Sequence, residues 1–328
     1  MYGPRKHAII SQIHDLKEKV NDGDLVLMRL GCELLDIGVV HGSYEFHQEF
    51  DDVLGWDLQH TRRVRWANLS EQQIEEVKTI VPELEKVLKP SPTANPTLGQ
   101  VRGLSTQQES QLRQMVPPRS LKPLPNEERV SQPLSDEEVG ELMFRAGLPG
   151  ENVDRFLAFL RHAQRLWRWY LSVSRTFRSP SEAEIVTHLV IPLMRILGWS
   201  EQQLAVEWRI PNRRKKIDLV LFDVRHGRFK PLILCEVKRL GVPLEIFAAG
   251  QAQSYAESVI KADERFDSLK IVVVTDGIRY FLYQRKNKTW DEKPSGYANL
   301  SRLRTRNLIP QGTNAVETLV SLMPRAVE

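Results

Sequence analysis

Two short apolar segments in the second half of the chain alternate in a way that is typical of strands. Residues 217–222 and 232–237 are rich in Val, Ile, Leu and Phe. Because side chains alternate faces along a strand, Glu236 and Lys238 point the same way. A carboxylate and an ammonium on a core strand cost free energy unless they are paired or bound. They form either a structural ion pair with Asp218 nearby by accident, or a metal-dependent phosphodiesterase centre.

Further periodic segments surround these two strands. Residues 204–210 and 278–283 predict two more strands, residues 244–262 a crossover helix, and residues 315–322 a closing helix. The strands at residues 204–210, 217–222 and 232–237 follow one another through turns, which predicts an antiparallel meander. The crossover helix leads into a strand at residues 271–274, expected to lie parallel to the strand that carries Glu236. The pattern predicts an α/β fold whose mixed sheet is flanked by helices.

Three helices are predicted upstream of this sheet. A capping-box pattern at Ser135 begins a helix over residues 137–146, and a longer helix follows over residues 153–173. The longer helix has an apolar side and an arginine-rich side, which either follows a phosphate backbone or is simply solvated. The third helix begins at Ser179-Pro180-Ser181-Glu182, and Pro192 within its pattern predicts a kink.

The N-terminal part of the chain has a different pattern. A helix is predicted over residues 5–20, and a second helix begins with a capping box at Ser70. Between them lie short β-like segments separated by glycines, at residues 25–28, 34–40, 44–46 and 61–66. Frequent glycines between short strands are typical of a small, tightly curved barrel, which we expect over residues 1–89.

Residues 90–133 separate the two parts. Eight prolines lie among Ser, Gln and Thr, at positions 90, 92, 96, 117, 118, 123, 125 and 133. This composition predicts a semi-rigid linker, interrupted by a short helix over residues 105–115. The expected organisation is therefore a barrel, a linker and a larger α/β domain over residues 134–328.

Charge, cysteine content and apolar runs bear on the partners and the cellular compartment that we expect for this protein. Lys and Arg number 46 against 42 Asp and Glu, and this mild excess permits nucleic acid as a partner without requiring it. Cys32 and Cys235 are far apart in sequence, so neither a disulfide framework nor a zinc cluster is expected. The longest apolar run, residues 185–197, is interrupted by polar residues and too short to span a bilayer. We expect a soluble cytoplasmic protein with no membrane partner.

The order of acidic and basic residues resembles a known superfamily. Asp218, Glu236-Val237-Lys238 and Gln251 with Tyr255 are similar to the signature of the PD-(D/E)XK nuclease superfamily. Within it, residues 134–328 most resemble the N-terminal nuclease domain of type I restriction enzyme R subunits. One departure is Ile217, which stands where the superfamily name has Pro. The resemblance implies a PD-(D/E)XK nuclease-like mixed sheet flanked by helices.

The resemblance also implies roles for these residues. Asp218 and Glu236 would bind Mg²⁺, for which Mn²⁺ can substitute, with the Val237 carbonyl as a third ligand. Lys238 would orient or deprotonate the attacking water and stabilise transition-state charge, and Gln251 would hold the water, Lys238 or a phosphate. The resemblance favours Glu182 as the acid of the preceding helix that would complete the metal site, with Glu184 left open as its alternative. The other interpretation is that this acid only complements the dipole of the first helical turn.

Nucleic-acid contacts are predicted in two places. Beside the proposed centre these are Tyr255 and the cationic turn Arg213-Arg214-Lys215-Lys216. The N-terminal part loosely resembles PUA/EVE-like barrels fused to some restriction endonucleases. There the predicted contacts are Arg62, Arg63 and Arg65 with phosphates and Trp66 stacked on a base. The alternative is that Trp66 belongs to the core of an edge strand whose arginines are solvated.

The resulting hypothesis is a prokaryotic Mg²⁺-dependent endonuclease that cuts double-stranded DNA in restriction or anti-phage defence. Homo-oligomerisation or a partner protein of the same defence system is compatible with it, and dependence on base modification is a separate prediction. Two alternatives stay open. One is a non-cleaving nucleic-acid-binding or assembly subunit that kept the fold, and the other is an effector nuclease for RNA or DNA that is activated by a ligand or partner.

Overall fold

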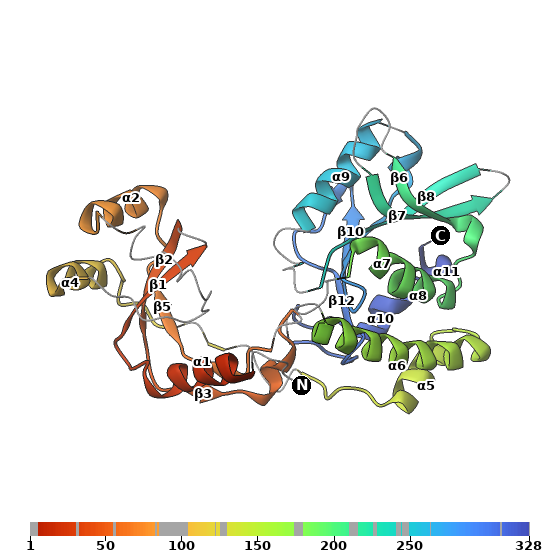
Figure 1. The fold of residues 1–328 in the computed structure, drawn as a ribbon. Coiled ribbons are helices and arrows are strands. Elements are labelled where there is room, and N and C mark those ends of the chain that lie inside the picture. Colours follow the sequence, from red (N-terminus) through yellow and green to blue (C-terminus); the bar gives the residue numbers. More distant parts are fainter. Residues whose placement is uncertain are drawn as a thin grey trace. The chain divides into compact units, whose positions relative to one another are not determined.

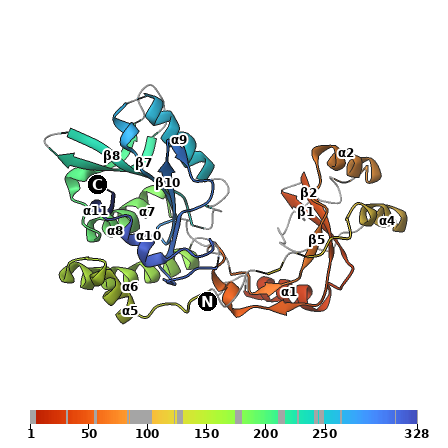
Figure 2. The same cartoon turned by 180° about the vertical axis from the view of Figure 1, so that it is seen from behind.

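The chain forms two compact units. The computed structural model describes residues 6–30, 33–54, 57–82, 84, 104–121, 123–124, 130–173, 180–209, 216–225, 228–240, 244, 249–262, 264–308 and 310–327. The first unit comprises residues 1–50 and 58–125, and the second comprises residues 51–57 and 126–328. Figures 1 and 2 show both units from opposite sides.

A seven-stranded mixed sheet lies at the centre of the second unit (Figure 1). Its strands are β6 (Leu204–Arg209), β7 (Lys216–Arg225), β8 (Arg228–Val237), β9 (Ile271–Thr275), β10 (Arg279–Lys286), β11 (Thr289–Trp290) and β12 (Gly296–Asn299). β6, β7 and β8 form the antiparallel meander expected from the sequence, and β8 pairs with β9 in parallel. The predicted α/β class, meander and parallel crossover pairing are thus confirmed.

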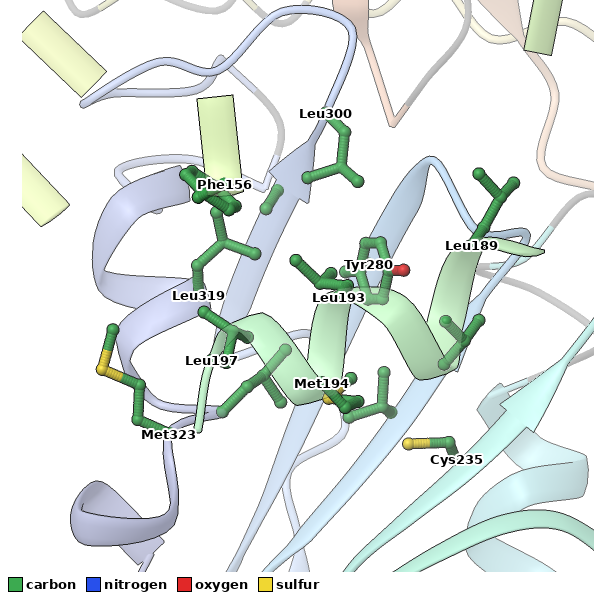
Figure 3. Close-up of a cluster of buried hydrophobic side chains, with 14 of the residues drawn as sticks. Phe156, Leu189, Leu193, Met194, Leu197, Cys235, Tyr280, Leu300, Leu319 and Met323 are labelled. Atoms are coloured by element: carbon green, nitrogen blue, oxygen red, sulfur yellow. The ribbon is translucent and has the colours of Figure 1, made fainter. Parts of the chain in front are cut away.

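Helices pack against both faces of this sheet because its strands are apolar on both sides. They are α5 (Asp136–Arg145), α6 (Gly150–Val173), α7 (Glu182–Ile185), α8 (Ile191–Ile196), α9 (Ala249–Ala262), α10 (Ala315–Val320) and α11 (Pro324–Val327), with 3₁₀ turns at Glu201–Gln203 and Glu264–Ser268. On β8, Cys235 joins the core of α6, α8 and α10, shown in Figure 3, whereas Leu234 joins the core beneath α9. None of the described helices is long and apolar enough to cross a membrane.

The predicted kink at Pro192 takes the form of a widened helical turn. A π-helical turn, Val186–Val190, joins α7 to α8, and Pro192 lies in the first turn of α8. Proline has no N–H and its ring crowds the carbonyl of the residue four positions earlier. A π-turn just before it absorbs this mismatch while Leu189 and Leu193 stay buried.

A segment from the N-terminal part of the sequence, residues 51–54, is built into the second unit. The Asp52 carboxylate accepts hydrogen bonds from the Tyr297 hydroxyl at 2.8 Å and from the Asn299 amide at 3.1 Å. Asp51 pairs with Arg304 at 2.8 Å. Asp52 is only 2% exposed, so these bonds replace water that the carboxylate loses on folding.

The first unit contains an open sheet. Its described elements are α1 (Lys6–Glu18), β1 (Leu25–Leu30), β2 (Glu33–Val40), β3 (Glu45–Phe46), a 3₁₀ turn (Gln48–Asp52), β4 (His60–Thr61), β5 (Val64–Trp66), α2 (Glu71–Ile80) and α4 (Thr106–Gln114). The strands form a sheet in the order β1-β2-β5 and a separate β3-β4 pair. The expected barrel is not closed among these residues, because β3, β4 and β5 are only two or three residues long and the pair does not join the sheet.

The helix predicted within the linker is present as α4, and it packs into the first unit. Leu112 of α4 is fully buried with Ile37 of β2 and Val77 of α2. Ser105 caps α4 with a complete capping box, as Ser70 does for α2. Residues 104–116 therefore belong to the core of the first unit rather than to a solvated spacer.

Candidate active site

Asp218 and Glu236 lie on neighbouring antiparallel strands. The register pairs Leu219 with Cys235, so the next position along places Asp218 beside Glu236. Directly opposite residues of an antiparallel pair share a face, where their Cβ atoms lie about 5 Å apart. The Asp218 Oδ2 atom accepts a hydrogen bond from the backbone N–H of Val237 at 2.7 Å. This bond fixes the carboxylate at the end of β8.

Lys238 joins Glu236 at the same place. Its Nζ donates to Glu236 Oε1 at 2.6 Å, and the two side chains are 16% and 6% exposed. The Lys238 N–H also donates to the carbonyl oxygen of Thr275 at 2.8 Å, which holds this end of the chain against β9. The structure therefore brings together the three residues at the centre of the predicted site.

The carboxylates of this site resist ionisation. Burial raises the pKa of Asp218, and the charges of Glu182 and Glu207 act in the same direction. Burial, with the charge of Asp218, raises the pKa of Glu236 to about 6, although its bond to Lys238 opposes the rise. Burial disfavours the Lys238 ammonium, but Glu236 outweighs this effect and the pKa of Lys238 is raised. When the acids of this site are ionised, Lys238 alone does not balance their negative charge.

This charge imbalance bears on whether the residues fit a divalent cation. Asp218, Glu236 and Glu182 carry three formal negative charges when ionised, against one positive charge on Lys238. Carboxylate oxygens are the ligands that Mg²⁺ prefers, and an added dication would neutralise the excess. In the described part of the chain, however, no three Asp, Glu, His or Cys side chains stand close enough to hold a metal together. The carboxylate donors and the net negative charge of the site fit Mg²⁺, and Asp218 and Glu236 are the two carboxylates that lie side by side on neighbouring strands.

The structure distinguishes between the two acids of the third helix. Ser181 caps α7, and Glu184 completes its capping box by accepting from the Ser181 N–H at 2.9 Å. The charge of Glu182 instead influences the pKa values of Asp218, Glu236 and Lys238. The Glu182 charge therefore lies within electrostatic range of the site, whereas Glu184 completes the helix cap.

The remaining predicted residues near the site are only partly described. Gln251 and Tyr255 both lie on α9, where Tyr255 is half-buried, and the Gln251 side chain lies outside the described set. Arg213, Arg214 and Lys215 also fall outside the described residues. Lys216 begins β7 and forms an ion pair with Glu207, so it would have to exchange that partner for a phosphate.

Glu207 is a residue of this region that the sequence pattern did not indicate. Val206 pairs with Leu219 and Trp208 with Ile217, which places Glu207 opposite Asp218 on the side away from Glu236. Its φ of 50° is unusual for a strand residue other than glycine. The sequence holds no signal for this, because a single Glu in an alternating strand is ordinarily a solvated residue.

In the first unit, two of the predicted DNA contacts, Arg62 and Trp66, have structural partners, whereas the buried Nε atom of Arg65 has no hydrogen-bond partner among the described residues. Arg62 donates from Nε to the carbonyl of Leu16 at 3.1 Å and from its terminal nitrogens to Lys17 and Gly42. It thus satisfies carbonyls at the C-terminal end of α1, as basic side chains do at helix ends. Trp66 pairs with Gly38, where an added Cβ would lie 2.8 Å from the indole ring. Arg63, Arg65 and Trp66 are all half-buried.

Comparison with known proteins yields one match. A family described as "Domain of unknown function (DUF8426)" matches residues 2–82, which lie within the N-terminal part of the chain. Neither the curated proteins nor the solved structures gave a match to the chain.

Proposed function

We propose that the second unit is a Mg²⁺-dependent endonuclease that hydrolyses phosphodiester bonds of double-stranded DNA. The observation that carries this proposal is the convergence of Asp218, Glu236 and Lys238 at the ends of two adjacent strands. The mixed sheet flanked by helices supports the proposal, because the PD-(D/E)XK resemblance implies a sheet of this kind. A role in prokaryotic restriction or anti-phage defence belongs to the same proposal.

Each residue of the site has a chemical task in this reaction. A bound Mg²⁺ supplies Lewis-acid stabilisation of phosphoryl charge and lowers the pKa of a water ligand. Asp218 and Glu236 would hold the cation through carboxylate oxygens, with the Val237 carbonyl as a backbone ligand. Lys238 orients the attacking water and stabilises negative charge that develops on the phosphate. Gln251 and Tyr255 contact the water and the DNA from α9.

Burial of the two carboxylates suits this role. The raised pKa of Glu236 shows that its ionised form is short of stabilising partners when no cation is bound. A cation that neutralises this charge recovers free energy on binding and competes with Lys238 for the Glu236 carboxylate. Metal binding would therefore free the Lys238 ammonium to face the reacting phosphate as a charge stabiliser.

Plasmid cleavage tests the proposal. Supercoiled plasmid is incubated with the full chain in Mg²⁺ or Mn²⁺, beside Asp218→Ala and Lys238→Ala variants. Because each variant removes a group that acts in the transition state, we expect cleavage to fall at least about 100-fold. Matched controls change the same residue types at the opposite end of the same strands, Asp223→Ala on β7 and Lys230→Ala on β8. Equal cleavage by the wild type and all four variants would disprove the proposal.

A second candidate is a nucleic-acid-binding or assembly subunit that does not cleave. It is favoured by the side-chain positions themselves, since no three acids in the described residues stand close enough to share a metal. Salt-dependent DNA binding without cleavage in either metal, unaffected by Lys238→Ala, would support it. A nuclease activated by a ligand or partner predicts instead that cleavage begins only when that molecule is added.

A further inference from the structure

Helix α6 has a buried apolar side and an exposed side that carries its charged residues. Its apolar side, including Phe156, Phe159, Leu160 and Ala163, is buried in the core of the second unit. The opposite side, which we name the basic face of α6, carries the exposed residues Arg155, Arg161, His162, Arg165 and Arg168. Because the buried apolar side already packs inside the protein, that side is not available to a partner. A partner would meet the exposed side, where Trp169 and Leu171 accompany the charged residues.

Acids accompany the basic face only at the N-terminal end of α6, where Glu151 and Asp154 are exposed. No Asp or Glu occurs from Arg155 to Val173, although acids and bases are nearly balanced in the chain as a whole. Arg161 pairs with Asp136 of α5 at 2.9 Å. Among the described residues, Arg155, Arg165 and Arg168 form no ion pair. Positive side chains three and four residues apart repel one another on a helix, so an anionic partner would relieve this repulsion.

The dimensions of this face suit an extended polyanion. Arg155 and Arg168 are thirteen residues apart, which corresponds to about 20 Å along the helix axis. Double-stranded DNA carries one charge per roughly 1.7 Å of its axis, so several phosphates lie within that span. Trp169 is 52% exposed at the same end as Arg165 and Arg168, where its ring is available to stack on an unpaired base.

We propose that the basic face of α6 binds the phosphate backbone of the nucleic acid that the site cuts. The inference rests on the proposed function for the identity of the polyanion, whereas the surface itself follows from the distribution of charge on α6. Figures 1 and 2 show α6 beside α5 at the side of the second unit opposite α9. The bound duplex is therefore longer than the few nucleotides that contact the site.

The salt dependence of binding tests this inference without cleavage. A labelled duplex is titrated with the full chain in EDTA at several salt concentrations, and the slope of log K against log salt is measured. The triple variant Arg155→Gln, Arg165→Gln, Arg168→Gln is expected to lower the slope by about 2 to 3, because each lost phosphate contact removes about 0.9. Its affinity at about 0.1 M salt is expected to fall at least tenfold.

A second triple variant controls for net charge. Lys230→Gln, Lys261→Gln and Lys293→Gln remove the same three charges from exposed positions on other elements. We expect its slope to change by less than about 1. Equal slope changes in the two triple variants, or an unchanged slope in the α6 variant, would overturn the inference. So would labelled polyglutamate that binds more tightly than DNA and loses affinity in the α6 variant, because the partner would then be an acidic protein.

Two further measurements test the role of Trp169 and distinguish this inference from the proposed function. Trp169→Ala is expected to weaken binding of single-stranded DNA at least fivefold and of duplex by less than twofold, since a duplex presents no free base face. Equal weakening of both would show that Trp169 does not stack on an unpaired base. A protein whose slope depends on α6 but that never cuts contradicts the proposed function, whereas one that cuts with an unchanged slope contradicts this inference.

Discussion

The second unit contains two groups of buried charges that are stabilised in opposite ways. In the first group, Asp276 is 2% exposed and accepts hydrogen bonds from the N–H groups of Ile278 and Arg279 and from the Arg279 guanidinium. Both oxygens have partners, and the charge is balanced by one arginine. In the second group, burial raises the pKa of both Asp218 and Glu236, the charge of Asp218 raises the pKa of Glu236 further, and one lysine serves both acids.

The contrast separates structural charges from functional ones. A buried ion pair whose oxygens are all bonded is fully accounted for by the stability of the fold. A group that leaves negative charge uncompensated is retained at a cost to stability, and such groups concentrate at functional sites. On this argument, the Asp276–Arg279 pair stabilises the loop after β9, and the Asp218–Glu236–Lys238 group is the candidate functional site.

The largest expected effect is on stability at the structural pair. Asp276→Asn leaves the Arg279 guanidinium buried without a countercharge, so we expect the free energy of unfolding to fall by about 3–5 kcal/mol. Asp218→Asn removes a carboxylate that burial already disfavours, and its effect should lie within about 1 kcal/mol of zero or stabilise the protein. Urea denaturation of both variants measures the two free energies. Equal destabilisation by the two changes would remove the distinction between the groups.

The pH dependence of stability gives the next largest effect. The pKa of Glu236 is raised from 4.5 to about 6, so the folded state binds this proton more tightly than the unfolded state. Stability is therefore lost as pH rises through this window, by about 2 kcal/mol for Glu236. In EDTA, the free energy of unfolding of Glu236→Gln, relative to that of the wild type, should therefore rise by this amount between pH 4 and pH 8.

Denaturation curves at several pH values, expressed as the difference between variant and wild type, measure this effect. Glu292→Gln, at an exposed position, is the matched control and should give a flat difference. A flat difference for Glu236→Gln as well would show that the Glu236 carboxylate is not destabilised in the folded protein.

The smallest expected effect distinguishes the two acids of α7. Glu182→Gln should weaken Mn²⁺ binding about tenfold, because its charge acts on both Asp218 and Glu236. Glu184→Gln should leave the affinity unchanged, since Gln also completes a capping box. Calorimetric titration with Mn²⁺ measures both affinities, and a larger effect of Glu184→Gln would reverse the assignment.

Much of the second unit could be predicted from sequence because its signals are local. The alternation around Asp218 and Glu236 predicts two strands that place both acids at one sheet position. The pattern Ser181-x-x-Glu184 also held the information that assigns Glu184 to the helix cap, although the resemblance to a family was what favoured Glu182.

Other features depend on contacts between distant residues and left no local signal. The bonds of Asp52 to Tyr297 and Asn299 join positions about 245 residues apart, which a local pattern does not show. Glu207 lies opposite Asp218 because of the strand register, and its positive φ falls at the position between the paired residues Val206 and Trp208. The prediction of a closed barrel in the N-terminal part was wrong for the residues that the structure describes. Glycine spacing indicates curvature but does not determine which strands pair.

The most direct test of the central claim is Mn²⁺ binding measured by electron paramagnetic resonance, which counts bound ions without any cleavage. We predict that the wild type binds Mn²⁺ and that the double variant Asp218→Asn, Glu236→Gln binds it at least 100-fold more weakly. The matched variant Asp223→Asn, at the other end of β7, should bind as the wild type does. A wild type that binds no Mn²⁺, or a double variant that binds it equally well, would contradict the account.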